Sequence, residues 1–264
     1  MSLEELYRYL RWRMDPEDEE ARKRFQRIVE VAKKLELPRN GRILDICAGT
    51  GIAGVAFALA TNASKLTVLD MRRDDLEKVD EWIRISGREV QVDKVVGDAR
   101  SVHELVGEHD IAVLWGLTMP HFDAFDAIKL FASVALILSK EGYFIIEETD
   151  RVYGIMYMVG YKDFLVESEG EDYQLVSVHS GYDKRRGAFR RTYYKLPGFE
   201  KVTEEYHRLW DLASQLAIGL IFFKEYKLLD RFQHGVHGVS DVIVFRKPRK
   251  NVAEEIIHSP PSTF

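Results

Sequence analysis

Cysteine is almost absent from this 264-residue chain, which has only Cys47. A single thiol cannot form a disulfide framework or a cysteine-rich zinc site, so both are excluded within one chain. It also fits a reducing compartment, and we expect a cytoplasmic location and no bound metal.

Membrane-spanning segments are missing as well. The longest apolar stretch, residues 212–223, contains Ser214 and Gln215 and is shorter than the roughly 20 residues that a spanning helix needs. The first residues do not have the layout of a signal peptide. We therefore expect no membrane partner.

An excess of positive charge is the third absence. Asp and Glu number 43 against 38 Lys and Arg, which gives a net charge of −5. This argues against a dedicated nucleic-acid binder, although a local basic face could still exist. Hydrophobic residues make up 46% of the chain, which is enough for a large core.

Strand-like and helix-like segments alternate in the middle of the chain. Strands are expected at residues 42–47, 65–70, 90–96, 111–115 and 143–147, and helices at residues 52–60, 74–85 and 124–138. This alternation predicts a parallel sheet with helices on both faces, which is a doubly wound, Rossmann-like α/β fold.

The flanking segments lack this alternation. We expect one N-terminal helix at residues 3–13 and a second that begins at the N-cap pair Asp15-Pro16. Further on we expect an apolar helical stretch at 153–166, a hairpin of 173–182 and 188–195, a helix at 204–220, strands at 226–232 and 241–245, and a loose tail from 248.

These segments suggest one domain, residues 1–248, followed by a tail, residues 249–264. Within the domain, N-terminal cap helices occupy 1–37, a ligand-binding core 41–149, a lid or hairpin insertion 150–198, and a closing helix and strands 199–248. Ligands of open parallel sheets bind beyond the carboxyl ends of the strands, so the site is expected in the core.

Acidic and turn-forming residues follow the expected strands of the core. The first strand contains Asp45 and leads into Gly49-Thr50-Gly51, the second ends in Asp70, and the third is followed by Asp98. Because glycine has no Cβ, Gly49 and Gly51 allow a tight turn that can lie close to a ligand. The sequence therefore predicts a ligand site with an acidic rim.

Two kinds of ligand fit such a turn. Residues 49–54, GTGIAG, match the dinucleotide-binding pattern, and Asp70 lies 19 residues beyond Gly51. A pyrophosphate, however, seeks backbone amides and positive charge. The charge of Asp45 and the unassigned Asp98 favour a ligand with a sulfonium and an ammonium group. An NAD-type oxidoreductase and a non-catalytic binder of an adenosine ligand stay as alternatives.

Three segments resemble a known family. ILDICAGTGIAG, TVLDMRR and VVGDARS, in that order, are similar to the first three motifs of class I S-adenosylmethionine-dependent methyltransferases. The resemblance covers residues 41–148 and continues through the last two strands. It implies a seven-stranded, mostly parallel sheet with an antiparallel edge strand, and a small-molecule enzyme with a hairpin lid.

The resemblance also implies roles for individual residues. Asp45, Gly49 and Gly51 would hold the methionine part of the cofactor, Asp70 the ribose, and Asp98 with Ala99 the adenine. The full expected cofactor set also contains Cys47, Ala48, Thr50, Met71 and Trp115. The family's usual first glycine is Cys47 here, and we interpret this side chain as packing, not catalysis.

Methyl transfer needs a catalytic base only if the acceptor must lose a proton early. The candidates are His121, in the loop after the fourth strand, and Glu147 or Glu148, at the end of the fifth. His121 could instead cap the following helix. Trp115 could line the adenine site or simply pack at its strand end.

The acceptor is expected to be a small molecule under the insertion at 150–198, with Tyr153, Tyr157 and Tyr161 in its pocket. Basic and aromatic residues are interleaved at 184–195, a pattern that could bind RNA. A solvated edge hairpin explains the same residues. An RNA or protein methyltransferase is therefore the alternative.

Overall fold

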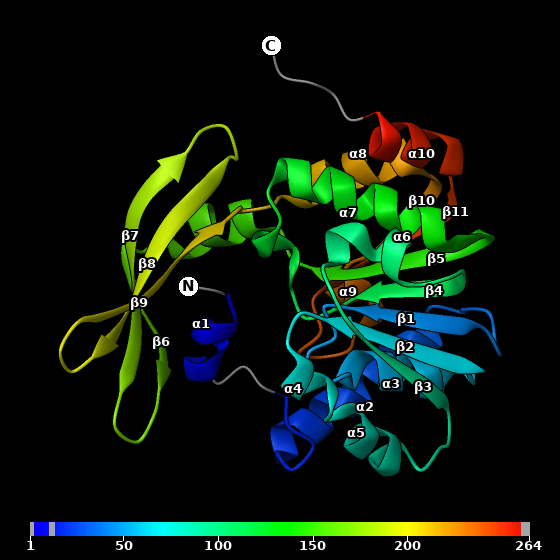
Figure 1. Cartoon of the computed structure of the whole chain (residues 1–264), viewed down its shortest axis with the longest axis horizontal. Coiled ribbons are helices and arrows are strands. Elements are labelled where there is room, and N and C mark those ends of the chain that lie inside the picture. Colours follow the sequence, from blue (N-terminus) through cyan, green and yellow to red (C-terminus); the bar gives the residue numbers. More distant parts are fainter. Residues whose placement is uncertain (1–2, 11–13, 260–264) are drawn as a thin grey trace. The chain divides into compact units, whose positions relative to one another are not determined.

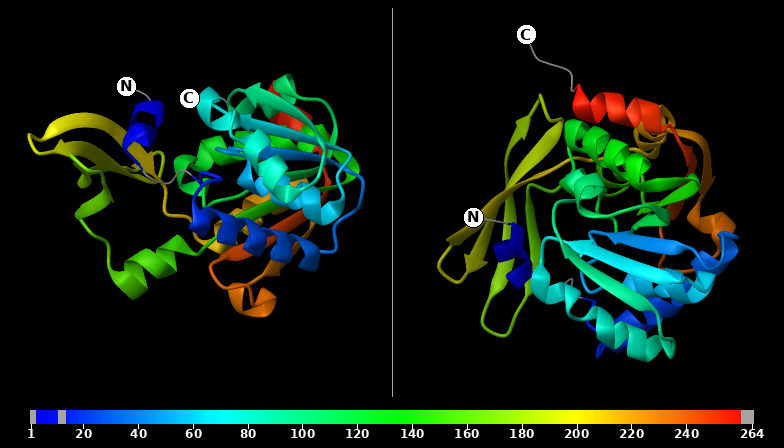
Figure 2. Two further views of the ribbon diagram at one scale, coloured as in Figure 1. Left: turned by 90° about the horizontal axis from the view of Figure 1, so that it is seen from below. Right: turned by 45° about the vertical axis from the view of Figure 1, so that its right-hand side comes forward.

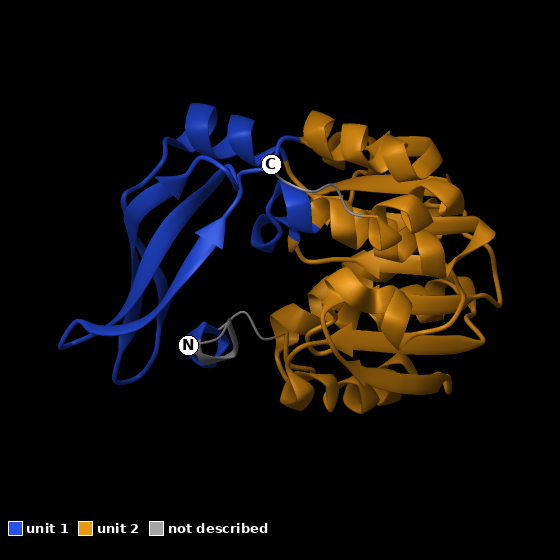
Figure 3. Cartoon of the chain, turned by 45° about the horizontal axis from the view of Figure 1, so that its top comes forward, with its two compact units in different colours: residues 1–13, 119–126, 150–211 blue, residues 14–118, 127–149, 212–264 orange. Residues whose placement is uncertain are grey.

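The computed structural model describes residues 3–10 and 14–259 of the chain. The chain forms two compact units (Figure 3). Unit 1 contains residues 1–13, 119–126 and 150–211, and unit 2 contains residues 14–118, 127–149 and 212–264. Each unit is described by itself below.

Unit 2 is built on a seven-stranded sheet with the order β10-β11-β5-β4-β1-β2-β3 (Figure 1). β11 is antiparallel to both neighbours and the other strand pairs are parallel, so the expected fold class is confirmed. The antiparallel strand is second from the edge, because β10 covers it. The strands are β1 (Arg42–Ile46), β2 (Lys65–Asp70), β3 (Gln91–Val96), β4 (His109–Leu114), β5 (Leu138–Glu148), β10 (Phe223–Leu229) and β11 (Asp241–Pro248).

Helices cover both faces of this sheet (Figures 1 and 2). α2 (Glu19–Lys34), α3 (Ile52–Thr61) and α5 (Val79–Ser86) pack together on one face. α7 (Ala124–Ile137), α8 (Leu212–Phe222) and α10 (Lys250–His258) lie on the other. Short helices connect the strands: α4 (Arg73–Leu76), η1 (Ala99–Ser101), α6 (Val102–Leu105) and α9 (Arg231–His234). No helix in the described part of the chain combines the length and apolarity needed to cross a membrane.

Helix boundaries in unit 2 differ from the expectation at three places. α2 begins at Glu19 and is capped by Asp18, which accepts a hydrogen bond from the Glu20 amide, whereas residues 15–18 form a turn. The helix expected at 74–85 is broken into α4 and α5, where the Lys78 amide bonds three residues back. The expected loose tail contains α10, because Ala253 is fully buried and anchors it.

Unit 1 contains a four-stranded antiparallel sheet, β6-β7-β8-β9. The hairpin of β7 and β8 confirms the expected one. Leu6 and Leu10 pack with Leu175, Tyr193 and Val202 of this sheet. The elements are α1 (Leu3–Tyr9), η2 (Met119–His121), η3 (Val152–Val159), β6 (Phe164–Glu169), β7 (Gln174–Asp183), β8 (Ala188–Leu196) and β9 (Glu200–His207).

Two expectations for unit 1 were wrong. The helix predicted at 204–220 begins only at Leu212, because residues 200–207 pair with β8 as strand β9. The Trp210 indole then holds the connecting loop by donating to the carbonyl oxygens of Met119 and Phe122, each at 3.0 Å. The stretch expected to be helical from 153 to 166 is a π-helix as far as Val159, and it continues as β6 from Phe164.

Candidate active site

The turn between β1 and α3 uses left-handed backbone three times. Cys47, Gly49 and Gly51 have φ angles of 55°, 54° and 82°. The Ala48 amide donates to the Leu69 carbonyl at 3.0 Å, which ties the turn to β2. Cys47 thus adopts a conformation that favours glycine, and this explains why the family usually has glycine there.

The Cys47 thiol is not set up as a nucleophile. Burial raises its pKa, and the negative charges of Asp70 and Asp45 raise it further. The thiol therefore stays protonated at neutral pH, and only a thiolate is a good nucleophile. This agrees with the interpretation of Cys47 as a packing residue.

We expect Gly51→Ala to destabilise the protein by about 2–4 kcal/mol, because the change adds backbone strain and a clash. A Cβ on Gly51 would lie 2.7 Å from Cγ2 of Val79, which is fully buried in α5. Gly87→Ala is the matched control, since Gly87 has a φ of 67° but open space around it. Urea unfolding measures both. Equal losses in the two variants would contradict the clash.

Asp45 is almost fully buried, with 1% of its surface exposed. Its Oδ2 accepts a hydrogen bond from the Gly54 amide at 2.7 Å, while its Oδ1 has no partner among the described residues. A Cβ on Gly54 would lie 2.8 Å from the Asp45 side chain, so glycine permits this approach. Burial raises the pKa of Asp45 to about 7, opposed by the Gly54 bond. One buried acceptor is thus available for a ligand donor.

Asp70, at the end of β2, is 6% exposed and accepts four hydrogen bonds. The amides of Gly49 and Arg72 donate at 2.8 and 2.9 Å. The Arg72 guanidinium donates through Nε at 3.1 Å and through Nη2 at 3.3 Å. The structure therefore brings the second-strand acid directly against the glycine turn.

Asp98 precedes η1, and its carboxylate bonds the amide and guanidinium of Arg100. Burial alone would raise its pKa, but the Arg100 bonds outweigh burial and lower it. Ala99 is the first residue of η1, where amides have no partner within the helix. Met71 follows Asp70 and is 63% exposed, so its side chain can meet a ligand.

Thr50 and Trp115 are occupied by contacts within unit 2. The Thr50 hydroxyl donates to the Met14 carbonyl at 2.7 Å and accepts from the Trp82 indole at 3.1 Å. Trp115 is buried in the core, edge-on to the Phe57 ring at 5.2 Å. Both side chains support the walls of the site.

Glu147 joins three segments of unit 2 through its buried carboxylate. It accepts hydrogen bonds from the Arg24 guanidinium at 3.1 Å and from the amides of Gly116 and Ser240 at 3.0 and 3.2 Å. Burial raises its pKa, although these partners oppose the shift. A carboxylate held by three donors positions the loop after β4, and the sequence spacing gave no sign of these partners.

His121 lies in unit 1, within a group of two histidines and two tyrosines. Its Nε2 is hydrogen-bonded to the Tyr7 hydroxyl at 3.2 Å, and its ring meets that of His207 at 5.5 Å. His207 Nε2 is bonded to the Tyr193 hydroxyl at 2.8 Å. Burial lowers the pKa of His207 to about 3, helped by repulsion from His121 and nearby arginines. His207 is therefore neutral. Sequence reasoning missed Tyr7 and His207.

The three predicted pocket tyrosines, also in unit 1, do not form one cluster. Tyr153 and Tyr157 are exposed on η3 and stack on each other at 5.5 Å. Tyr161 packs instead on Phe189 of β8 at 4.7 Å, and its hydroxyl bonds His179 at 2.9 Å.

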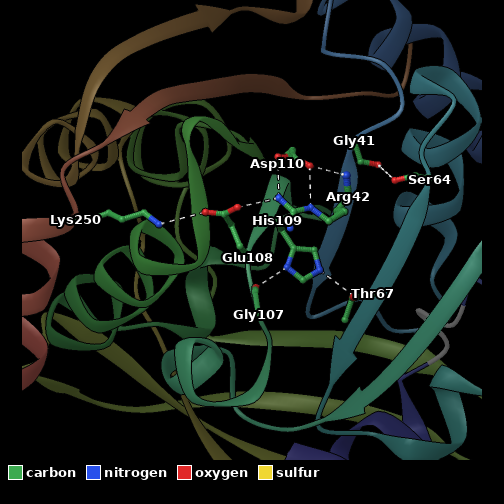
Figure 4. Close-up of polar contacts among 9 residues, drawn as sticks. All are labelled: Gly41, Arg42, Ser64, Thr67, Gly107, Glu108, His109, Asp110 and Lys250. Carbon is green, nitrogen blue, oxygen red and sulfur yellow. Dashed lines mark hydrogen bonds and ion pairs between the residues drawn. The ribbon is translucent and has the colours of Figure 1, made fainter.

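A second polar cluster lies at the amino ends of β1 and β4, at the opposite end of the sheet from Asp45 and Asp70 (Figure 4). His109 bonds the Gly107 carbonyl and the Thr67 hydroxyl at 2.8 and 2.9 Å. The neighbouring strands are joined there by an ion pair of Arg42 with Asp110. Burial lowers the pKa of His109, so it serves as a neutral bridge. This cluster stabilises the sheet.

The core of unit 2 is similar to known proteins. Residues 43–142 match the family model described as a methyltransferase domain. No sequence among the curated proteins matches the chain.

Several solved structures share the fold. The PH0226 protein of Pyrococcus horikoshii aligns with a TM-score of 0.62 at 18% identity, over 93% of this chain and 100% of its own. An S-adenosylmethionine-dependent methyltransferase of Clostridium acetobutylicum has a TM-score of 0.57 at 15% identity, over 86% and 91%. The CcbJ methyltransferase of Streptomyces caelestis has 0.59 at 14%, over 83% and 89%. At these identities the likeness shows the fold.

The three motifs lie where that fold requires them, at the ends of β1, β2 and β3, and the first two lie in contact through Gly49 and Asp70. The match to the methyltransferase model covers all three. The chain therefore contains a methyltransferase domain, and it is an enzyme that moves the methyl group of S-adenosylmethionine to an acceptor.

Proposed function

We propose that this enzyme methylates a small molecule in the cytoplasm. The observation that carries the proposal concerns the basic hairpin at 184–195. Most of its cationic side chains contact other residues of unit 1. Binding to RNA needs several cations free to meet phosphates.

Arg191 is the clearest case, because it is only 6% exposed. It donates to the Ser177 hydroxyl at 2.7 Å, to the Lys162 carbonyl at 2.9 Å and to the Tyr161 hydroxyl at 3.1 Å. Arg190 donates to the Ser180 carbonyl at 2.6 Å. These two guanidinium groups hold the strands of unit 1 together.

Other cationic side chains of the hairpin form ion pairs or contacts with aromatic rings. Arg186 lies 3.6 Å from Asp123 and stacks on the Tyr206 ring at 4.9 Å. The Lys195 ammonium is 5.8 Å from the centre of the Tyr9 ring. Within the described residues, only Lys184 and Arg185 of this group have side chains without such a contact. Two available cations are too few to bind the phosphates of a nucleic acid.

The cofactor is proposed to bind at the carboxyl ends of β1, β2 and β3. Asp45 suits its ammonium group, because Oδ1 is a buried acceptor without a partner in the described chain. Gly54 leaves room beside that carboxylate, and Ala48, Gly49 and Gly51 of the adjoining turn are proposed to lie along the methionine part. When bound, the cofactor supplies an electrophilic methyl group on a sulfonium sulfur.

The nucleoside end is proposed to lie along the next two strand ends. Asp70 would accept the ribose hydroxyls, Asp98 and the Ala99 amide would bond the adenine edge, and Met71 would cover its face. We propose that Cys47, Thr50 and Trp115 shape this site through packing, since the Cys47 thiol is protonated, the Thr50 hydroxyl is already bonded and the Trp115 ring packs on Phe57.

For the acceptor we propose that unit 1 sets the choice of substrate. His121, bonded to Tyr7, is suited to take a proton from an acceptor hydroxyl or amine. Tyr153 and Tyr157 offer exposed rings for an organic acceptor. Glu147 is proposed to position the loop after β4, and not to act as the base, because three donors hold it.

Labelled S-adenosylmethionine tests the acceptor class. We expect label from the methyl group to enter the low-molecular-weight fraction of a cell extract and not its RNA or protein. Retention on an RNA column should be weak and the same in Lys184→Ala/Arg185→Ala as in the parent. Labelled RNA whose formation is lost in that double variant would contradict the proposal.

A further inference from the structure

Each of the two acids proposed to hold the nucleoside accepts hydrogen bonds from the arginine two residues later. In Asp70-Met71-Arg72, Oδ1 of the acid accepts from the arginine amide at 2.9 Å and from its Nε at 3.1 Å. In Asp98-Ala99-Arg100 the same two distances are 2.9 and 3.0 Å. The same local geometry therefore recurs at the ends of the neighbouring parallel strands β2 and β3.

The Arg72 contact uses the outer edge of the Asp70 carboxylate. A carboxylate has about four lone-pair sites, and four donors meet Asp70. Two are backbone amides, those of Gly49 and Arg72, and they fix the carboxylate. The other two are Nε and Nη2 of Arg72. A ribose diol also needs two acceptor sites, and only those used by the Arg72 side chain can be given up without opening the turn.

Arg72 has a second anchor. Its Nη1 forms an ion pair with Asp75, a buried residue of α4. The guanidinium also lies against the glycine turn, since a Cβ on Gly49 would be 3.3 Å from Nη2. The side chain can therefore leave Asp70 while Asp75 still neutralises its charge.

We propose that Arg72 is a built-in competitor of the cofactor ribose. In the free enzyme its guanidinium bridges Asp70 and Asp75 and occupies the acceptor sites that the ribose hydroxyls require. Cofactor binding displaces the guanidinium from Asp70. This inference rests on the proposed ribose role of Asp70. Arg100 does the same at Asp98 with less effect, because that acid is more exposed and its bonds compete with water.

Calorimetric titration with S-adenosylhomocysteine at pH 8 tests the competition. Arg72→Met removes the competitor, so it should bind about tenfold more tightly than the parent, a size typical of one charge-assisted contact. Arg73→Met is the control, since it removes the same charge from the exposed neighbouring residue, and it should bind like the parent. Unchanged or weaker binding by Arg72→Met would overturn the inference.

A second readout uses the free protein. Without the Arg72 guanidinium, no cation bridges Asp70 and Asp75, so the melting temperature of free Arg72→Met should be lower than that of the free parent. Saturating S-adenosylhomocysteine should raise the melting temperature of Arg72→Met more than that of the parent. Arg72→Lys keeps the charge but not the two-pronged donor, and should lie between. An equal rise in all three proteins would contradict the competition.

Asp70→Asn separates this inference from the proposed function. If Asp70→Asn binds S-adenosylhomocysteine as well as the parent, the ribose role of Asp70 is wrong. If Asp70→Asn loses binding but Arg72→Met gains none, the ribose role stands and only the competition is wrong. Arg100→Met should show a gain smaller than that of Arg72→Met.

Discussion

Asp45→Asn is expected to lose tight binding of S-adenosylhomocysteine at pH 8 and, at the same time, to make the free protein more stable. The variant keeps an oxygen that can accept from Gly54, but it removes the buried charge that suits the ammonium of the ligand. Loss of a charge-assisted contact at a buried site should raise the dissociation constant at least tenfold.

The gain in stability follows from the pKa of Asp45. Burial raises this pKa from 3.8 to about 7, so the unfolded chain releases the proton more readily than the folded one. The stability that the neutral carboxyl contributes is present below about pH 4 and is lost as the pH rises through about 7. At pH 8 the asparagine should therefore add on the order of 2 kcal/mol.

Urea unfolding at pH 4.5 and at pH 8, with calorimetry at pH 8, measures both effects. The difference in stability between Asp45→Asn and the parent should be smaller at pH 4.5 than at pH 8. Asp74→Asn, which removes an exposed charge nearby, is the control and should change neither quantity much. A variant that binds like the parent would show that Asp45 does not meet the cofactor.

Asp70→Ala is the second change with a large expected effect. Two hydrogen bonds from the ribose to a nearly buried carboxylate should together be worth about 3 kcal/mol or more, so affinity should fall at least about 100-fold. The fold should persist, because the Ala48 amide still ties the turn to β2 by donating to the Leu69 carbonyl. Circular dichroism checks the fold and calorimetry the affinity.

The core of the fold was predictable because its signals are local. The strand at 65–70 was predicted to the residue, and the turn that follows β1 was visible from Gly49 and Gly51. β9 was missed because its charged residues, such as Glu204 and Glu205, hide the pairing with β8. α10 was missed because its anchor, Ala253, is buried only by tertiary contacts.

The sequence suggests candidate residues for the site but not the groups that they contact. Asp45 lies within the first strand, Asp70 ends the second and Asp98 follows the third, and these places make them candidates. The Arg24 and Ser240 partners of Glu147 come from distant segments that spacing cannot connect. Arg72 lies only two residues after Asp70 in the sequence. Its contact with Asp70 could still not be predicted, because it depends on how the turn after β2 folds.

The most direct test of the cofactor site compares two ligands on two proteins. The parent and Asp70→Ala are each titrated with S-adenosylhomocysteine and with its analogue that lacks both ribose hydroxyls. We predict that the analogue binds the two proteins equally weakly and that only the natural ligand distinguishes them. If Asp70→Ala binds S-adenosylhomocysteine as tightly as the parent, or weakens both ligands alike, Asp70 does not hold the ribose.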